Sequence, residues 1–250
     1  MKLRSLNRYQ AFAWHFLFSA LLGLAVFLLF RFVWYPGALW DLSGAGKLLL
    51  LVVGVDITIG PLLTLIVFNP KKKSLPFDLA TIALVQTTAL AYGVWIMSQS
   101  RPVYLVGVVD RIVIVSANEI DPESLGRAGP EFARLPWTGP RLIGATRTGQ
   151  KEDDFQIAMD ALSGGPDIDR LADHYVPFQA VADGIAAHGL TLSALKERKS
   201  EPKVAAILDR LGGQPLGPKA RVVMLRGRTG FGTAIVDSDR LVITSDQDIW

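Results

Sequence analysis

The sequence predicts a membrane protein with three transmembrane α-helices followed by a soluble α+β domain whose sheet is mainly antiparallel. Half of the 250 residues are hydrophobic, and most of them fall in three long runs, at about residues 11–34, 48–68 and 79–97. After residue 98 no comparable run occurs, and charged residues come every few positions. We therefore expect a three-helix transmembrane domain over residues 1–98 and an α+β domain over residues 99–250.

Each apolar run is long enough to cross a bilayer as a helix. A helix rises about 1.5 Å per residue and a hydrocarbon core is about 30 Å thick, so roughly 20 residues suffice. The first run follows a basic start, as a secretory signal does, but its apolar core is longer and no small-residue cleavage motif follows Leu29. We therefore expect an uncleaved first span.

The distribution of Lys and Arg predicts the orientation of the spans. Lys71, Lys72 and Lys73 separate the second and third runs, and the amino terminus is also basic, whereas residues 35–46 contain neither Lys nor Arg. Basic loops stay in the cytoplasm. The three lysines are therefore predicted topology anchors, with the amino terminus cytoplasmic and residues 99–250 on the opposite side of the membrane.

The overall positive charge does not indicate a nucleic-acid-binding protein. Of 26 Lys and Arg and 23 Asp and Glu, residues 1–97 hold 8 and 3, which leaves 18 and 20 for residues 98–250. The soluble part therefore has no basic excess with which to neutralise phosphates. The chain has no cysteine, so it has neither disulfides nor thiol chemistry.

Asp56 lies inside the second apolar run, where a charged side chain costs about 2.5 to 3.5 kcal/mol and usually has a partner. Counted along each helix from its cytoplasmic end, Asp56 and Gln86 lie about 18 and 14 Å deep, so we expect a hydrogen bond between them. This pair can lock the three helices together, contact the membrane helix of another protein, or belong to a proton relay. A relay needs a chain of such groups, and the spans offer one acid.

Gly60 and Pro61 follow one turn after Asp56. Proline has no amide hydrogen and clashes with the carbonyl four residues earlier, here that of Ile57, so we expect a kink at this point. Small residues four apart allow helices to approach closely. They occur in the first and third runs as Ser19 with Gly23 and as Ala89 with Gly93.

The soluble domain shows the patterns of both strands and helices. Runs of β-branched and aromatic residues predict strands at 103–106, 112–115, 221–225, 233–237 and 241–244. Apolar residues at helical spacing predict helices at 152–162, 177–187, 192–198 and 202–211. The segment 121–149 is rich in Gly, Pro and Arg and is predicted to be loop. Strands, helices and strands again indicate an α+β domain whose sheet joins both ends of the segment.

No catalytic set is recognisable in this domain. His174 and His188 lack metal-ligand spacing, and no serine lies in a nucleophile-elbow context. The glycine-rich segment 227–232 resembles a phosphate cradle, but it separates two strands and opens no helix, so a hairpin turn is the better interpretation. Trp137 is either a binding anchor or a lid on the core. We predict no enzymatic activity, no metal and no cofactor.

Several features occur in a characteristic order between about residues 45 and 120. They are Asp56, the run Gly60-Pro61-Leu62-Leu63-Thr64, Lys71 to Lys73, Asp78, Gln86, Tyr92-Gly93 and Arg101-Pro102-Val103. In this combination the segment resembles the TfpX/TfpZ type of type IV pilin accessory proteins. The remainder of the chain resembles that family in layout only.

The resemblance implies a bacterial inner-membrane protein that assists pilin stability, membrane handling or pilus assembly by binding pilin rather than by catalysis. The implied partners are the membrane helix and periplasmic head of a pilin subunit and the lipid bilayer. Asp56, Pro61, Gln86 and Trp137 are then candidate residues for pilin contact or for locking the helices. The alternative function is a membrane-tethered periplasmic ligand-binding or sensory protein, although the predicted cytoplasmic segments are short for an output domain.

Overall fold

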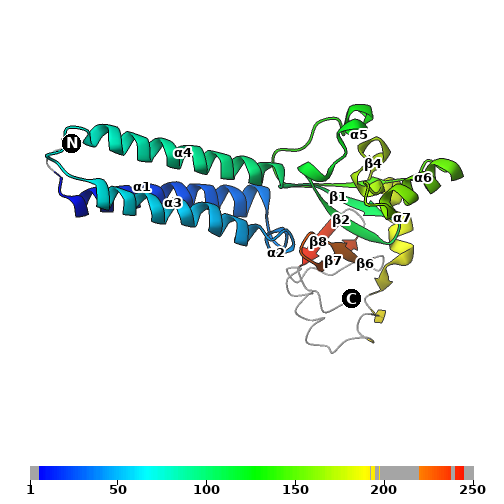
Figure 1. Cartoon of the computed structure of the whole chain (residues 1–250). Helices are drawn as coiled ribbons and strands as arrows, with labels where there is room; N and C mark the ends of the chain where they lie inside the picture. Colours follow the sequence, from blue (N-terminus) through cyan, green and yellow to red (C-terminus); the bar gives the residue numbers. More distant parts are fainter. Residues whose placement is uncertain (1–5, 192, 195–196, 198–219, 238–239, 245–250) are drawn as a thin grey trace. The chain divides into compact units, whose positions relative to one another are not determined.

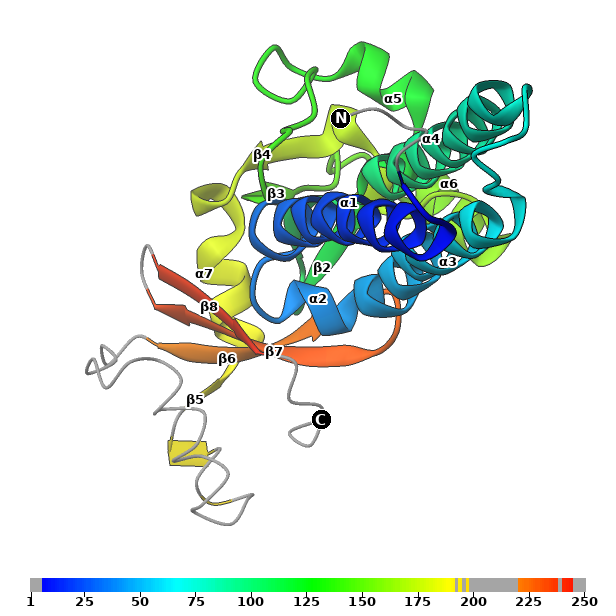
Figure 2. The same cartoon turned by 90° about the vertical axis from the view of Figure 1, so that its left-hand side faces the viewer.

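A computed structural model describes residues 6–191, 193, 194, 197, 220–237 and 240–244. The chain divides into two compact units, which are taken separately below (Figures 1 and 2). The helical unit comprises Met1–Val33 and Ala45–Gln99, and the sheet unit comprises Trp34–Gly44 and Ser100–Trp250. The expected helix at 202–211 and most of that at 192–198 lie outside the described residues.

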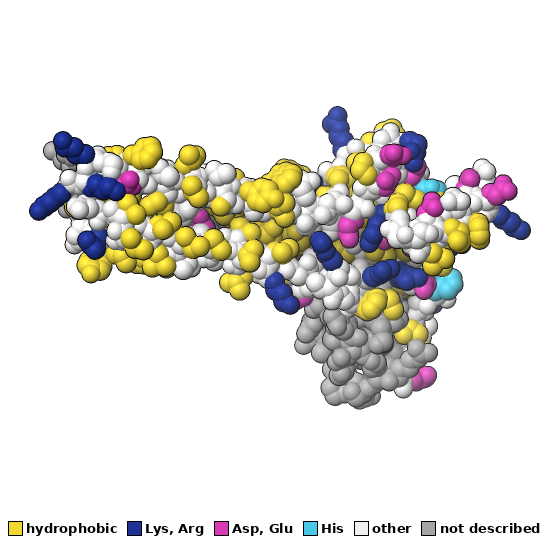
Figure 3. Space-filling model, viewed as in Figure 1, with side chains coloured by type: hydrophobic (Ala, Val, Ile, Leu, Met, Phe, Trp, Pro, Cys, Tyr) yellow, Lys and Arg dark blue, Asp and Glu magenta, His cyan; other side chains and the backbone are white. Residues whose placement is uncertain are grey.

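The helical unit consists of three long helices that lie side by side (Figures 1 and 2). They are α1 (Arg8–Leu29), which continues into the π-helical turn η2 (Phe30–Trp34), α3 (Ala45–Val67) and α4 (Leu75–Gln99). Each is long and apolar enough to cross a membrane, as the sequence predicted. Apolar side chains cover much of their outer surface (Figure 3), as expected for helices whose solvent is lipid.

Basic residues gather at one end of the helical unit (Figure 3). This end holds the start of α1 and the loop from α3 to α4, with exposed Lys71 and Lys73. Lys72 pairs with Asp78 in the first turn of α4 at 2.6 Å, where the positive end of the helix dipole favours an acid. The loop lysines and the start of α4 therefore form one ordered, charged end.

The sheet unit contains one eight-stranded mixed sheet, in the order β4-β3-β1-β2-β6-β7-β8 with β5 paired to β6. Neighbouring strands are antiparallel except for the parallel pairs β1–β3 and β2–β6, so the predicted mainly antiparallel sheet is confirmed. The strands are β1 (Pro102–Val108), β2 (Arg111–Ser116), β3 (Arg141–Ala145), β4 (Tyr175–Pro177), β5 (Leu190–Thr191), β6 (Arg221–Arg226), β7 (Phe231–Asp237) and β8 (Arg240–Thr244).

Two buried clusters cover the sheet. In one, the rings of Tyr104 and Phe132 meet Tyr175 edge to face, with ring centroids 5.3 and 5.9 Å from that of Tyr175. In the other, Phe178 and Ile185 pack against β1, β2, β6 and β7. The helices of this unit are α2 (Leu39–Leu42), α5 (Pro122–Arg127), α6 (Lys151–Leu162) and α7 (Gln179–His188), with 3-10 turns η3 (Ala117–Glu119), η4 (Ile168–Arg170) and η5 (Ala172–His174).

The prediction that residues 121–149 form only loop was wrong, because α5 and β3 lie there. The Asp121 carboxylate accepts a hydrogen bond from the Ser124 amide at 2.7 Å, and Pro122 occupies the first turn, so a short capped helix forms. β3 pairs in parallel with β1 and buries Ile143. That pairing partner is far away in sequence, and five residues carry too little periodicity to reveal the strand.

The segment Trp34–Gly44 connects α1 to α3 but belongs to the sheet unit. Its short helix α2 places Leu39 and Leu42 in the same buried cluster as Phe178 and Ile185. The β6–β7 hairpin turn, present as predicted, holds the end of α2: the Thr229 amide and hydroxyl both donate to the Leu42 carbonyl oxygen, at 3.1 and 2.8 Å. A division of the chain at residue 98 would instead place this segment with the membrane helices.

Gly227 makes this contact possible. A Cβ built at Gly227 would lie 2.8 Å from the carbonyl oxygen of Leu42 and 2.9 Å from the Cβ of Leu42. Both distances are shorter than the contacts that Cβ atoms make in real proteins. The glycines of segment 227–232 therefore let the hairpin turn approach α2, in addition to forming the turn itself.

We expect Leu42→Ala to destabilise the sheet unit by about 2 to 5 kcal/mol, because the leucine is fully enclosed and its removal leaves a cavity. The measurement is thermal unfolding of the detergent-solubilised protein, followed by the circular dichroism of the sheet. Leu162→Ala is the matched control, since the same atoms are removed from a side chain that is exposed. Equal melting temperatures for the two variants would contradict the burial of α2 in this core.

Candidate functional site

The middle helix of the bundle, α3, contacts both α1 and α4. Small residues allow both contacts: a Cβ at Gly23 of α1 would lie 2.6 Å from Val53, and a Cβ at Gly93 of α4 would lie 2.6 Å from Val52. His15 of α1 approaches Thr64 of α3, with 2.6 Å between Nδ1 and Oγ1. Polar and small residues of the spans therefore meet partners within the bundle.

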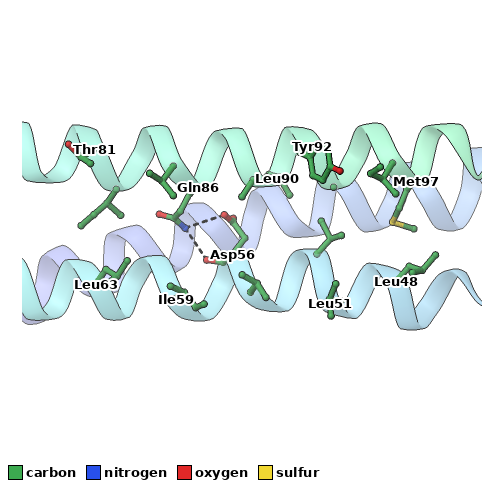
Figure 4. Close-up of a pocket in the computed structure, with 17 residues that line it drawn as sticks. Leu48, Leu51, Asp56, Ile59, Leu63, Thr81, Gln86, Leu90, Tyr92 and Met97 are labelled. Atoms are coloured by element: carbon green, nitrogen blue, oxygen red, sulfur yellow. Dashed lines mark hydrogen bonds between the residues drawn. The ribbon is translucent and has the colours of Figure 1, made fainter.

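Asp56 of α3 and Gln86 of α4 meet, as the depth count predicted. The Gln86 Nε2 group donates to Asp56 Oδ1 and to the Asp56 main-chain oxygen, both at 3.1 Å (Figure 4). Both acceptors are oxygens, so the amide nitrogen must face them. The Asp56 side chain is buried, with the residue 9 % exposed. The buried Gln86 Oε1 has no hydrogen-bond partner among the described residues.

Gly60 provides the space for this hydrogen bond. A Cβ at Gly60 would overlap the amide group of Gln86. Gly60 follows Asp56 by four residues and so lies on the same face of α3, one turn further along. Pro61 is buried beside it, and α3 continues through both residues to Val67. The structure thus gathers Asp56, Gly60 and Gln86 at one point, next to Pro61, and the expected kink stays a prediction.

A groove of about 600 Å³ runs between α3 and α4, and the Asp56–Gln86 pair lies within it (Figure 4). The α3 residues that face Gly23 and His15 of α1 do not line it, so it opens on another face of α3. Its other lining residues are Leu48, Leu51, Val52, Val55, Ile59, Leu63, Thr81, Ile82, Val85, Ala89, Leu90, Tyr92, Gly93, Ile96 and Met97.

The chemistry of this groove suits binding. Its walls are almost entirely aliphatic, and Asp56 is the one acid among its lining residues. Neither a chain of titratable groups nor a pair of groups suited to acid–base catalysis lines it. The Asp56–Gln86 pair is the polar point in these otherwise largely apolar walls.

Trp137 belongs to the sheet unit and covers a buried arginine. The Arg101 guanidinium carbon lies 4.4 Å from the centroid of the Trp137 ring, and Arg101 Nη2 donates to the Pro136 carbonyl oxygen at 3.2 Å. Trp34 packs against the same ring, with centroids 5.8 Å apart. Arg101 is 6 % exposed whereas Trp137 is 63 % exposed, so the ring shields the cation and turns its other face outward.

Burial changes the proton affinities of this cluster. It lowers the pKa of Arg101 and raises the pKa of Tyr35 to about 12, an effect that the nearby arginines Arg228 and Arg101 partly offset. Tyr35 therefore stays neutral where an exposed tyrosine ionises. Its contribution to stability is present below pH 10 and is lost as the pH rises from 10 towards 12.

The two histidines of the sheet unit have ordinary structural partners. His174 Nδ1 lies 3.1 Å from the Thr146 carbonyl oxygen, and His188 Nδ1 lies 2.8 Å from that of Gly184. In the part of the chain that the structure describes, no group of three or more His, Asp or Glu side chains could hold a metal ion.

Two features of the site were missed from sequence. The first is the role of Gly60 in leaving space for the Gln86 side chain, although its position four residues after Asp56 was a usable signal. The second is the lining of the groove, which depends on how α3 and α4 are rotated about their axes and has no signature in either helix alone.

We expect Gly60→Ala to displace the Gln86 side chain and weaken the contact of α3 with α4. In a Gln86→Ala background the same substitution should have little effect, so a double-mutant cycle should give a coupling of about 0.5 to 3 kcal/mol. Unfolding of the purified protein in detergent measures it. Gly54→Ala is the control on the same helix, because a Cβ there meets no atom within 4 Å. Additive effects of Gly60→Ala and Gln86→Ala would show that the two residues do not meet.

We expect Trp137→Ala to lower the stability of the sheet unit by about 0.5 to 2 kcal/mol, because Arg101 loses the ring that shields it. Trp137→Phe, which keeps an aromatic face, should lose less. Thermal unfolding again provides the measurement. An unchanged melting temperature in Trp137→Ala would remove the lid interpretation and leave the ring as a binding anchor.

Three proteins with similar sequences are all named fimbrial assembly proteins. The chain is 33 % identical over 186 residues to the fimbrial assembly protein, serogroup I, of Dichelobacter nodosus, which covers 73 % of the chain and 72 % of that protein. It is 34 % identical over 173 residues to the serogroup E1 protein of that organism, covering 68 % and 67 %. A third relative, of serogroups C1 and C2, is 37 % identical over 116 residues, covering 46 % and 88 %.

No protein-family profile and no solved structure matches the chain. The first two relatives exceed 30 % identity, and the matched residues cover two thirds or more of their length. Matches of that extent include more than the apolar spans. The chain therefore belongs to the family of fimbrial assembly proteins.

Proposed function

We propose that the protein is a type IV pilin accessory factor of the TfpX/TfpZ kind, which assists pilin stability, membrane handling or pilus assembly by binding pilin rather than by catalysis. The observation that carries the proposal is the apolar groove between α3 and α4, with its one buried polar pair. Because the chain belongs to the fimbrial assembly family, pilus assembly is the process in which we expect this groove to act.

The partner that suits the groove is the apolar helix of a pilin subunit held in the same membrane. Helices in lipid associate through close packing and hydrogen bonds, because lipid chains are as apolar as leucine and provide no hydrophobic driving force. The aliphatic walls of the groove offer the packing surface. Asp56, Gln86 and the neighbouring Pro61 would contact the bound helix or hold the groove open, while Trp137 contributes to the fold of the sheet unit.

The proposed location is the bacterial inner membrane, with the amino terminus and Lys71 to Lys73 in the cytoplasm and the sheet unit in the periplasm. The basic end of the helical unit supports this orientation. The sheet unit adds an independent argument, since it is built from the segment before α3 and the segment after α4. Both segments must therefore lie on the same side of the membrane. This is possible if the chain crosses the membrane twice between them, once as α3 and once as α4.

We expect Ala89→Trp to reduce the amount of pilin that co-purifies with the protein by about tenfold, equivalent to about 1.4 kcal/mol, because the indole would fill the groove. Asp56→Leu should lower surface piliation while the protein remains at its normal abundance. Pull-down from detergent-solubilised membranes and counting of surface pili provide the measurements.

Ala83→Trp is the matched control, because Ala83 is exposed on the same helix and does not line the groove. It should retain wild-type pilin recovery. Normal recovery and piliation in both Ala89→Trp and Asp56→Leu, at normal abundance, would contradict the proposal that the groove holds pilin.

A further inference from the structure

A hollow of about 610 Å³ opens at the basic end of the helical unit, between the start of α1 and the loop that joins α3 to α4. Both segments belong to the same compact unit, and Figure 3 shows basic side chains gathered at this end. The hollow shares no lining residue with the groove between α3 and α4. Its lining residues are Asn7, Arg8, Tyr9, Phe68, Asn69, Pro70 and Lys71.

Phe68 holds the walls of the hollow together. It follows the last residue of α3 and is only 1 % exposed, because it packs in a small buried cluster with Ala11 of α1 and Leu75 of α4. The start of α1 and the loop are therefore joined by a packed contact, and the hollow between them is part of the folded unit.

The two asparagines of the hollow are fixed by hydrogen bonds to the main chain. The Gln10 amide donates to Asn7 Oδ1 at 2.8 Å, and the Lys71 amide donates to Asn69 Oδ1 at 3.0 Å. Because a backbone amide requires an acceptor, the oxygen of each side chain is the atom that faces it. Each asparagine is left with its Nδ2 group, which can only donate.

The hollow combines these donors with positive charge and contains no acid. Arg8 and Lys71 are both exposed, and among the described residues neither takes part in a salt bridge. No Asp or Glu lines the hollow, and the acid at the start of α4, Asp78, is paired with Lys72. A ligand that suits this site carries negative charge and several acceptor oxygens.

The place of the hollow favours a lipid among such anions. It lies at the ends of helices that are long and apolar enough to cross a membrane, and basic pockets at this level bind acidic headgroups. Tyr9 lines it and is 70 % exposed, as suits an amphipathic ring at the membrane–water interface. A headgroup with an amine would bring its positive charge beside Arg8 and Lys71, where no acid of the lining could pair with it.

We infer that this hollow binds the phosphate of an anionic phospholipid that has no amine in its headgroup, with Arg8 and Lys71 as the charged partners. The inference goes beyond the proposed function, because it requires the helical unit to lie in a bilayer but does not require the groove to bind pilin. A lipid bound there would contact both the start of α1 and the loop before α4.

The test measures binding of phosphatidylglycerol to the delipidated full-length protein in neutral detergent, by native mass spectrometry. Arg8→Gln and Lys71→Gln should each weaken binding about fivefold, because a basic residue near an anionic lipid contributes about 1 kcal/mol. Phosphatidylethanolamine, whose headgroup carries an amine, should bind more weakly than phosphatidylglycerol. Both variants should unfold at the wild-type temperature, since the replaced side chains are exposed.

Lys73→Gln is the matched control, because it removes the same charge from the same loop, at an exposed residue that does not line the hollow. It should retain wild-type affinity. A protein in detergent has no membrane orientation, so the role of the lysines as topology anchors does not enter the comparison.

Equal weakening by Lys71→Gln and Lys73→Gln would overturn the site, and so would equal affinity for the two lipids. Displacement of phosphatidylglycerol by an equal concentration of inorganic phosphate would assign the hollow to a soluble anion and overturn the lipid assignment. Each of these results leaves the proposed function untouched, because that is tested by pilin recovery in Ala89→Trp.

Discussion

The burial of α2 in the sheet unit constrains how the chain can run through α3 and α4. Leu39 and Leu42 are enclosed by strand and helix side chains, and Thr229 holds the carbonyl end of α2 with two hydrogen bonds. Two helices that are long and apolar enough to cross a membrane, α3 and α4, separate this segment from the sheet in sequence. The start of α3 and the end of α4 are therefore both joined in sequence to one folded core.

Within the helical unit, packing and hydrogen bonding take the place of hydrophobic burial. Gly23 and Gly93 let neighbouring helices approach α3, and Gly60 lets Gln86 reach Asp56. The absence of a side chain at Gly60 is what makes room for the polar pair. The same arrangement leaves a groove on one face of α3 and α4 that none of the described helices fills. This groove is the surface at which we propose that the protein receives a pilin helix.

The three spans and the Asp56–Gln86 contact could be predicted because each depends on composition or on depth along one helix axis. The strands β1, β2, β6, β7 and β8 were also evident, since β-branched runs indicate them locally. β3 and α2 were not, because each is short and is held by partners far away in sequence, β1 in one case and Thr229 in the other. The helix α6 was predicted correctly, but apolar spacing does not reveal whether a stripe faces a core or lies on the surface.

Because the chain contains no cysteine, single cysteines can report which side of the membrane each segment occupies. Asp41→Cys in the α2 segment, Asp110→Cys in the β1–β2 turn and Lys72→Cys in the loop before α4 each replace an exposed residue. In spheroplasts, a membrane-impermeant maleimide should label the cysteines at positions 41 and 110, and should label that at position 72 only after lysis. Labelling of positions 41 and 110 from opposite sides would contradict the shared core, and with it the orientation and the pilin-binding role built on it.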